Sequence, residues 1–271
     1  MFVRTGPAVA NRAVDDHGLV LTVRTERAVA ERTRPGQFFM IRRPGPSFPL
    51  LSRPFSIFDA DPESGDLSFL YEVVGLGTAL LRDVRPGDPV TLVGPLGNAF
   101  VPDASAERHF LVAGGVGIAP FLYLARCIGS ESRGGVTVLF GARTSSHLLG
   151  ISEFERAGVR VEVATDDGSR GHRGTSVDLL RETIRAAGDG ARLGLYACGP
   201  NAMLRAVKDL VSPARKCQIS LEARMACGFG ACVGCAFPVS APTAEGHRFA
   251  LVCKEGTVFE AGSVLFEKAG T

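Results

Sequence analysis

Four of the seven cysteines lie in the last 45 residues, and their spacing restricts the fold of this region more than any other sequence feature. Cys227, Cys232 and Cys235 are separated by four and two residues, and Cys253 follows after 17 more. The first 16 residues lack the uninterrupted apolar segment of a secretory signal. Without such a signal, clustered cysteines are typical of metal ligands rather than disulfides. We therefore expect four converging thiolates, in a chain from a reducing cytoplasm.

The loop between the first three of these cysteines is built from small residues, with glycine at positions 228, 230 and 234. Glycine permits a positive φ and a close backbone approach, so that N–H groups can point toward sulfur atoms. Three thiolates from one loop and a fourth from a distant segment are the arrangement of a plant-type [2Fe–2S] centre. We predict such a centre, with these four cysteines as ligands. A zinc site, which usually pairs two Cys-x2-Cys motifs, and four thiols without a metal are the alternatives.

The charge and hydropathy of the chain argue against two classes of function. The 271 residues include 30 basic and 28 acidic side chains, and the basic ones are spread along the chain. Nucleic-acid-binding proteins have a basic stripe or patch, so we expect no nucleic-acid partner. No window approaches the 18 consecutive apolar residues of a membrane-spanning helix, so we expect no membrane association.

Residues 1–102 have the pattern of a small antiparallel β-barrel. Short β-branched or aromatic segments occur at residues 18–26, 37–44, 68–74 and 89–94, between turns rich in glycine, proline and aspartate. Several short strands with such turns are typical of a barrel. The sequence predicts only one helix in this region, a short one at residues 78–84.

Strands and helices alternate after a polar linker at residues 102–107. The predicted strands are residues 109–114, 135–142, 159–165 and 192–199, and the predicted helices are residues 119–129, 151–158, 175–188 and 201–211. This alternation indicates a parallel sheet with helices on both faces. A third region, rich in cysteine and glycine, completes the chain. We therefore expect three domains, at residues 1–102, 103–215 and 216–271.

Two motifs in the predicted barrel are candidates for binding a phosphate-containing cofactor. Arg53-Pro54-Phe55-Ser56 offers a guanidinium, which can clamp a pyrophosphate, and a hydroxyl that can hydrogen-bond to a cofactor. Gly75-Leu76-Gly77-Thr78 follows a strand and precedes a short helix, where backbone N–H groups can bind a phosphate. A structural Arg-Pro turn and a hairpin turn or N-cap threonine are the alternatives.

Two further motifs lie at the ends of predicted parallel strands. The turn from Gly114 to Pro120 joins an apolar strand to a helix and favours a dinucleotide site, although it lacks the last glycine of the G-x-G-x-x-G fingerprint. Cys198-Gly199-Pro200 lies at the sheet edge where ligands bind in open α/β folds. Either motif can also be a simple turn. Arg143 could meet the 2′-phosphate of NADP, so the sequence leaves NAD and NADP open.

These motifs, in this order, resemble those of the ferredoxin–NADP reductase superfamily. The run Ser220-Leu221-Glu222-Ala223-Arg224-Met225-Ala226-Cys227 narrows the resemblance to the electron-transfer subunits of type B dihydroorotate dehydrogenase. The resemblance covers essentially the whole chain and implies a flavin-binding β-barrel, an NAD-binding α/β domain and a small [2Fe–2S] domain.

The resemblance also implies roles for individual residues. The FAD-binding residues would be Arg53, Pro54, Phe55, Ser56, Leu70, Tyr71, Glu72, Gly77 and Thr78. The residues framing the nicotinamide nucleotide would be Gly114, Gly115, Gly117, Pro120, Cys198, Gly199 and Pro200. Glu72 departs from the expected pattern, in which a basic or neutral residue stands at this position.

The implied function is electron transfer in pyrimidine biosynthesis. Electrons would pass from a partner dihydroorotate dehydrogenase subunit carrying FMN, in a heterotetramer, through [2Fe–2S] and FAD to NAD. A flavin converts between one-electron and two-electron carriers, so no catalytic side chain is predicted. The alternatives are a reductase subunit of the same architecture serving ferredoxin, hydrogenase or another partner, and a non-catalytic regulator without flavin.

Overall fold

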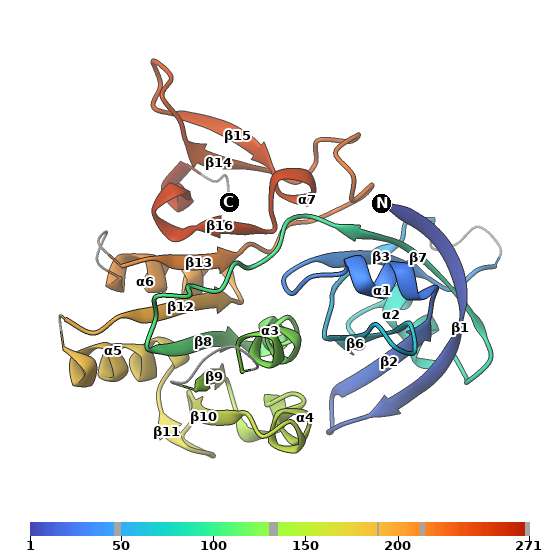
Figure 1. Cartoon of the computed structure of the whole chain (residues 1–271), viewed down its shortest axis with the longest axis horizontal. Helices are drawn as coiled ribbons and strands as arrows, with labels where there is room; N and C mark the ends of the chain where they lie inside the picture. Colours follow the sequence, from blue (N-terminus) through green and yellow to red (C-terminus); the bar gives the residue numbers. More distant parts are fainter. Residues whose placement is uncertain (46–49, 130–134, 189, 212–214, 269–271) are drawn as a thin grey trace.

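The computed structural model describes residues 1–45, 50–129, 135–188, 190–211 and 215–268. It contains two seven-stranded sheets and a separate two-stranded hairpin. The first sheet makes the N-terminal half, the second is covered by helices, and the hairpin stands over the edge of the second sheet (Figure 1). The predicted fold class is confirmed: an antiparallel β half precedes a mainly parallel α/β half and a small C-terminal region.

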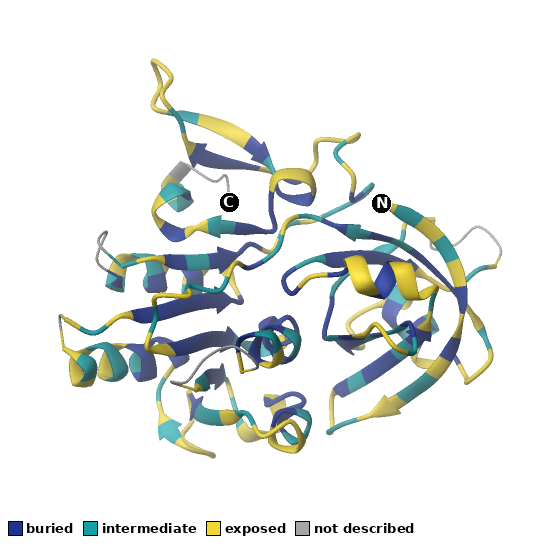
Figure 2. Ribbon diagram, in the orientation of Figure 1, coloured by how far each residue is buried: buried dark blue, intermediate teal, exposed yellow. Residues whose placement is uncertain are grey.

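The N-terminal sheet is antiparallel and curled into an open half-barrel, with β4 and β5 at its edges. Side chains such as Leu21, Phe39 and Phe69 are buried in one core. Buried positions are interspersed with exposed ones along the strands (Figure 2). The order in the sheet is β4-β3-β7-β1-β2-β6-β5. The strands are β1 (Phe2–Ala13), β2 (Gly18–Arg24), β3 (Phe38–Arg42), β4 (Arg53–Ser56), β5 (Asp59–Asp61), β6 (Asp66–Glu72) and β7 (Pro89–Leu96).

Besides the short edge strand β5, the sequence missed one helix and the first strand of this half. The prediction of a single helix is wrong, because α1 (Arg27–Arg32) precedes α2 (Leu76–Arg82). α1 has only six residues and no side-chain cap, and it is held by the burial of Val29 and Ala30. Strand β1 was not predicted because its apolar residues are small and irregularly spaced, yet it pairs with both β2 and β7. Both elements depend on tertiary contacts rather than on local propensity.

The α/β half confirms the predicted alternation. Its strands are β8 (Arg108–Gly114), β9 (Val136–Ala142), β10 (Arg160–Thr165), β11 (His172–Arg173) and β12 (Leu193–Cys198). Its helices are α3 (Phe121–Gly129), α4 (Ile151–Arg156), α5 (Ser176–Ala187) and α6 (Asn201–Leu210), with short 3₁₀ turns η1 (Gly115–Ile118) and η2 (Ser145–His147). The order in the sheet is β11-β10-β9-β8-β12-β13-β16.

Alternate residues of the parallel strands pack against different helices. Leu111 and Val138 share a core with residues of α3 and α4, on the face toward the N-terminal half. Val112 and Leu139, one position further on, share a core with residues of α5 and α6. Because both faces of these strands are buried, the strands read as continuous apolar runs, which explains why the sequence identified them correctly.

Part of the C-terminal region completes the second sheet. β13 (Cys217–Ser220) lies parallel to β12, and β16 (Val258–Glu260) lies antiparallel to β13. Between β13 and β16 the chain forms the hairpin strands β14 (Ala236–Ser240) and β15 (His247–Leu251) and helix α7 (Val252–Glu255). The 3₁₀ turns η3 (Ala261–Ser263) and η4 (Phe266–Lys268) follow β16. The division into domains at residues 102 and 215 stays a prediction, and the sheet itself extends across residue 215.

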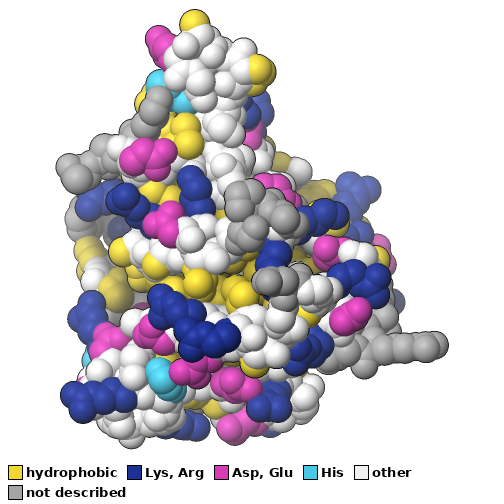
Figure 3. Space-filling model, turned by 90° about the vertical axis from the view of Figure 1, so that its left-hand side faces the viewer, with side chains coloured by type: hydrophobic (Ala, Val, Ile, Leu, Met, Phe, Trp, Pro, Cys, Tyr) yellow, Lys and Arg dark blue, Asp and Glu magenta, His cyan; other side chains and the backbone are white. Residues whose placement is uncertain are grey.

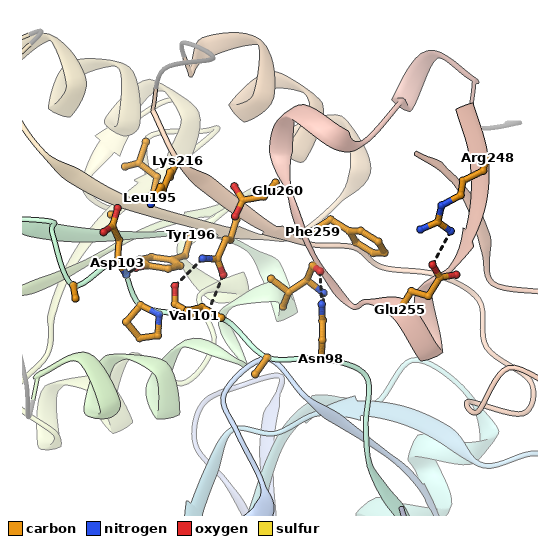
Figure 4. Close-up of a pocket in the computed structure, with 16 residues that line it drawn as sticks. Asn98, Val101, Asp103, Leu195, Tyr196, Lys216, Arg248, Glu255, Phe259 and Glu260 are labelled. Carbon is orange, nitrogen blue, oxygen red and sulfur yellow. Dashed lines mark hydrogen bonds and ion pairs between the residues drawn. The ribbon is translucent and has the colours of Figure 1, made fainter. Parts of the chain in front are cut away.

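The segment that leaves the half-barrel is tied to the C-terminal region by paired hydrogen bonds (Figure 4). The Asn98 amide donates to the Val258 carbonyl (2.7 Å), and the Val258 N–H donates to Asn98 Oδ1 (2.8 Å). Gln218 makes the same reciprocal pair with the backbone of Val101, at 2.7 and 2.9 Å. The residues that make these bonds line a groove of about 720 Å³. The bonds tie the end of the half-barrel to β13 and β16.

The surface carries mixed charges on the face shown in Figure 3. Basic and acidic side chains alternate there with apolar patches. Within the described ranges, none of the helices combines the length and the apolar character needed to cross a membrane.

Candidate functional site

A cavity of about 330 Å³ opens where the half-barrel, the α/β sheet and the C-terminal region meet, and we refer to it as the flavin cavity. β4 and β6 supply one wall, η1 and the end of β12 a second, and residues 220–225 a third. Many residues predicted to bind FAD line it: Arg53, Pro54, Phe55, Ser56, Leu70, Tyr71, Glu72 and Thr78. Chain segments with separate sequence signals therefore share one cavity.

Gly77 does not line the cavity but makes room for Arg53. A Cβ atom at position 77 would lie 2.5 Å from Arg53 Nε, so only glycine permits this placement of the guanidinium. Arg53 also donates through Nη1 to the Leu51 carbonyl. This bond orients the side chain at the cavity, where a guanidinium can bind a pyrophosphate.

Thr78 stabilises the turn that precedes α2. Its hydroxyl oxygen accepts hydrogen bonds from the N–H groups of Val74 (2.9 Å) and Gly75 (3.1 Å), and its O–H donates to the Gly75 carbonyl (3.0 Å). The N-cap threonine that the sequence left open is therefore not observed: Gly75 is the N-cap of α2, and Thr78, at the third helical position, binds back to it through its side chain. Thr78 also lines the cavity, so the turn presents its side chain to a bound cofactor.

Tyr71 is held in place by a residue that the sequence did not single out. Its phenol donates to Asn11 Oδ1 (3.0 Å), and its ring packs edge-on against Phe55 with 5.8 Å between ring centroids. Burial raises the pKa of Tyr71 to about 12 against the opposing effect of the Asn11 hydrogen bond. The ring is thus a neutral, immobilised wall of the cavity. Asn11 lies on a strand 60 residues away, and no local signal marks it.

The C-terminal wall of the cavity was not predicted as part of the flavin site. Ser220 donates to Thr257 Oγ1 (3.0 Å), and Thr257 donates to the Gly36 carbonyl of the half-barrel (2.9 Å). Glu222 is exposed to the cavity, but surrounding protein atoms desolvate its carboxyl group and raise its pKa. The run of residues 220–227 is a usable sequence signal, because it leads from this wall directly into Cys227.

A second cavity, of about 430 Å³, lies at the carboxyl ends of the parallel strands, and we refer to it as the nucleotide cavity. Gly114, Gly115 and Pro200 line it, as predicted for a nucleotide site. They lie at the carboxyl ends of β8 and β12, which are parallel neighbours in the sheet. The strands that follow them in the chain, β9 and β13, lie on opposite sides of this pair, and such a switch point is where open α/β sheets bind ligands.

The remaining predicted nucleotide residues have other positions. Gly117 and Cys198 line the flavin cavity, whereas Pro120 and Gly199 line neither cavity. A Cβ atom at Gly117 would lie 2.4 Å from the Cys198 carbonyl oxygen, so this glycine permits the turn to touch the end of β12. Burial raises the pKa of the Cys198 thiol far above its usual range, so it lines the cavity as a protonated thiol.

Several polar residues of the nucleotide cavity were missed by the sequence analysis. Thr175 caps α5: its hydroxyl accepts from the Asp178 N–H (3.2 Å), and its own N–H donates to Asp178 Oδ2 (2.9 Å). Asp166 and His147 line the same cavity as Arg143, which the sequence had marked. The sequence marks His147 and Asp166 only by their position, because His147 follows the carboxyl end of β9 and Asp166 follows that of β10.

The four predicted cysteine ligands come together as two pairs. The Cys232 N–H donates to Cys227 Sγ (3.5 Å), and the Cys253 N–H donates to Cys235 Sγ (3.4 Å). Cys235 and Cys253 are buried, whereas Cys232 is exposed. Gly228 and Gly230 have φ values of +80° and +91°, as expected for a loop that turns its N–H groups inward.

The electrostatics of the loop favour thiolates at its exposed side. Partial burial opposes ionisation of Cys227, but hydrogen bonds from the backbone N–H groups of Cys232 and Phe229 outweigh it and lower its pKa to about 6. Burial beside Cys235 instead raises the pKa of Cys253 to about 12. A positively charged metal centre would be needed to stabilise thiolates at both positions together.

The cysteine loop fits an iron–sulfur cluster in its donors. Among the described residues, no three His, Cys, Asp or Glu side chains have the geometry of a formed metal site. The donor set nevertheless consists of four thiols, with backbone N–H groups directed at two of the sulfur atoms. Such N–H bonds tune the potential of iron–sulfur centres, although four thiolates would also bind zinc.

Comparison with known proteins distinguishes these alternatives. Residues 222–265 match the family model of the iron–sulfur cluster binding domain of dihydroorotate dehydrogenase B, and residues 111–209 match that of an oxidoreductase NAD-binding domain. Both matches overlap the regions predicted from the cysteines and from the βα alternation. With the reductase fold, they support the predicted [2Fe–2S], FAD and NAD cofactors of an oxidoreductase.

The solved structures similar to this chain share all or a large part of its fold. A structure of an NADH-dependent reduced ferredoxin–NADP oxidoreductase is 26% identical, with a TM-score of 0.80, and the alignment covers 97% of this chain and 90% of that one. The ferredoxin reductase of carbazole 1,9a-dioxygenase is 21% identical, with a TM-score of 0.66, which shows a shared fold.

The curated relatives are more specific. The dihydroorotate dehydrogenase B (NAD(+)) electron transfer subunit of Bacillus caldolyticus is 38% identical over 261 residues, which cover 90% of this chain and 97% of the relative. The same subunit of Caldanaerobacter subterraneus is 39% identical over 237 residues, which cover 87% of this chain and 89% of the relative. This identity over nearly the full length of both proteins shows that the chain belongs to the family of dihydroorotate dehydrogenase B electron transfer subunits.

Proposed function

We propose that this chain receives electrons from a dihydroorotate dehydrogenase catalytic subunit carrying FMN and passes them through [2Fe–2S] and FAD to NAD, in a heterotetramer of pyrimidine biosynthesis. The observation that carries the proposal is the position of the flavin cavity. It adjoins the nucleotide cavity on one side, and its C-terminal wall leads into Cys227 within a few residues on the other. The same wall includes Thr257, which follows Cys253 at a distance of four residues.

The residues of the half-barrel would hold FAD. Arg53 would pair with its pyrophosphate, since it is the basic side chain of this cavity wall and is fixed by Gly77 and by the Leu51 carbonyl. The half-buried Phe55 and the buried Tyr71 would pack against apolar parts of the cofactor. FAD, when bound, supplies the conversion between single electrons and a hydride.

Cys227, Cys232, Cys235 and Cys253 would hold the cluster close to the surface. The loop around them exposes apolar side chains, with Phe229 at 49% and Val233 at 61% of their full exposure. An electron carrier must approach its partner's redox centre, and exposed apolar side chains beside it are suited to a protein contact. We therefore place the docking face for the catalytic subunit at residues 228–234.

Binding of NAD rather than NADP is supported by Asp166. A carboxylate repels a 2′-phosphate and can accept hydrogen bonds from ribose hydroxyls, as acidic residues do in NAD-specific sites. Arg143 lies in the same cavity and would attract a 2′-phosphate, so the two nucleotides must be compared directly. A cluster held by four thiols also suits a reducing compartment, and we propose the cytoplasm.

The proposal is tested by the visible spectrum of anaerobically purified protein before and after addition of NADH. Flavin bands with a broad iron–sulfur shoulder, both bleached by NADH, are expected. A colourless protein containing zinc, which remains unchanged by NADH after reconstitution with FAD, would contradict it. Titration with NADPH in place of NADH measures the nucleotide preference.

The similarity to the ferredoxin–NADP oxidoreductase structure favours one competing function, a reductase that serves ferredoxin. The two proposals differ only in the partner. Mixing the NADH-reduced protein with an FMN-containing dihydroorotate dehydrogenase or with ferredoxin, and following partner reduction, separates them. Reduction of ferredoxin alone would favour the second function.

A further inference from the structure

Glu72 occupies a unique place between the two cavities. Among the described residues that line them, it alone belongs to both the flavin cavity and the nucleotide cavity. It is the last residue of β6, where its backbone pairs with Gly18, and it is half-buried. The strand therefore delivers a carboxylate to the boundary between the sites.

The carboxylate of Glu72 has no partner in the described part of the chain. No hydrogen bond or ion pair reaches its side chain, although acidic side chains elsewhere, such as Glu153 and Asp66, are paired with arginines. The arginines of the two linings, Arg53 and Arg143, each belong to only one cavity. The negative charge at the boundary is thus not neutralised by a neighbour.

The boundary is where the nicotinamide ring must lie if the proposed function holds, and the inference rests on that function. Hydride transfer requires the reacting atoms to approach to about 3–3.5 Å, so the flavin and nicotinamide rings must be in contact without protein between them. Contact is possible only where the cavities adjoin, beside Glu72, the Gly115–Val116 step and the Cys198–Pro200 turn.

We propose that Glu72 discriminates between the two oxidation states of the nucleotide. The oxidised nicotinamide ring carries one positive charge, and it becomes neutral when it accepts a hydride from the reduced flavin, which is oxidised by two electrons. A half-buried carboxylate at this boundary attracts the cationic ring and not the neutral one. Glu72 therefore favours binding of NAD⁺ and release of NADH. This role also accounts for an acidic residue at a position where a basic or neutral one was expected.

The test measures binding rather than turnover, with protein loaded with FAD. Dissociation constants are determined by isothermal titration calorimetry for NAD⁺ and for tetrahydro-NAD, an analogue with an uncharged ring that cannot donate a hydride. Glu72→Gln keeps the size and a hydrogen-bond acceptor but removes the charge. We expect it to weaken NAD⁺ binding about tenfold and to change tetrahydro-NAD binding less than about twofold.

Two controls separate the charge at the boundary from other effects. Glu72→Asp retains the charge and should retain the preference for NAD⁺. Asp166 lines only the nucleotide cavity, and Asp166→Asn removes its charge. This variant should weaken the binding of NAD⁺ and of tetrahydro-NAD by the same factor. FAD content is measured for every variant by absorbance.

If Glu72→Gln lowers the affinity for NAD⁺ and for tetrahydro-NAD equally, or lowers neither, the inference is overturned. Loss of FAD from Glu72→Gln but not from Glu72→Asp would also overturn it, because Glu72 would then serve the flavin. A wild-type protein that binds FAD but neither nucleotide would instead contradict the proposed function.

Discussion

Glycine is frequent both in the turn after β8 and in the cysteine loop of residues 227–235, but the first segment is buried and the second is largely exposed. The turn lies between a buried strand and a buried helix, and Gly117 and Ile118 are themselves buried. The cysteine loop lies outside regular structure and exposes Cys232 and Val233. The sheet fixes the first loop without a ligand, whereas we expect the second to depend on the cluster that its thiols are proposed to hold.

The largest effect is expected where the metal is the main constraint. Cys232→Ser should lower the rate of electron delivery to the partner at least about 100-fold. FAD binding should be spared, because the flavin cavity does not include this residue. Partner reduction and flavin and iron content are the measurements. Cys127→Ser, on helix α3, is the matched control and should keep its iron. A Cys232→Ser variant that reduces the partner at the normal rate would exclude the cluster from the path.

A smaller effect is expected where the sheet is the constraint. Gly117→Ala would place a Cβ atom 2.4 Å from the Cys198 carbonyl oxygen, against backbone atoms that cannot move aside. We expect a loss of about 2–3 kcal/mol in the free energy of unfolding and weaker nucleotide binding, with the cluster retained. Chemical denaturation and NAD titration measure these effects. Unchanged nucleotide binding would show that the turn does not need this close contact.

Gly228→Ala is the corresponding change in the cysteine loop, and its effect should be smaller. The added Cβ atom would lie 2.5 Å from Met40 Cγ, but a methionine side chain can shift. The remaining cost is that of a positive φ in alanine, about 1–2 kcal/mol. We expect lower iron content with unchanged NAD affinity. A change in NAD affinity equal to that of Gly117→Ala would remove the distinction between the loops.

The smallest effect at neutral pH is expected in the rigid wall of the flavin cavity. Tyr71→Phe removes the hydrogen bond to Asn11 and should cost about 1 kcal/mol of stability. Because burial raises the pKa of Tyr71 to about 12, the unfolded chain ionises first, and folding stability falls as the pH rises from about 10 to 12. The variant should show a shallower fall in this range, measured by denaturation at each pH. An unchanged slope would show that Tyr71 is not the titrating group.

Much of the candidate site could be read from the sequence because its signals are local. The cysteine spacing, the glycine turn after β8 and the Arg53–Ser56 motif each lie within a few residues. The walls of the cavities are different, since Asn11, Glu222 and Thr257 reach the flavin site from three distant segments. Asn11 and Thr257 carry no pattern that local reasoning can detect, whereas Glu222 lies in the run of residues 220–227 that leads into Cys227.

The sequence by itself determined the order of the elements, the parallel strands and the identity of the cysteine ligands to be tested, because hydrophobic periodicity and ligand spacing are properties of neighbouring residues. Only the tertiary structure decided that β13 and β16 complete the α/β sheet, that α1 forms, and that Glu72 lies between two cavities. These features depend on contacts between residues far apart in the chain, and the energy of such contacts is absent from any local pattern.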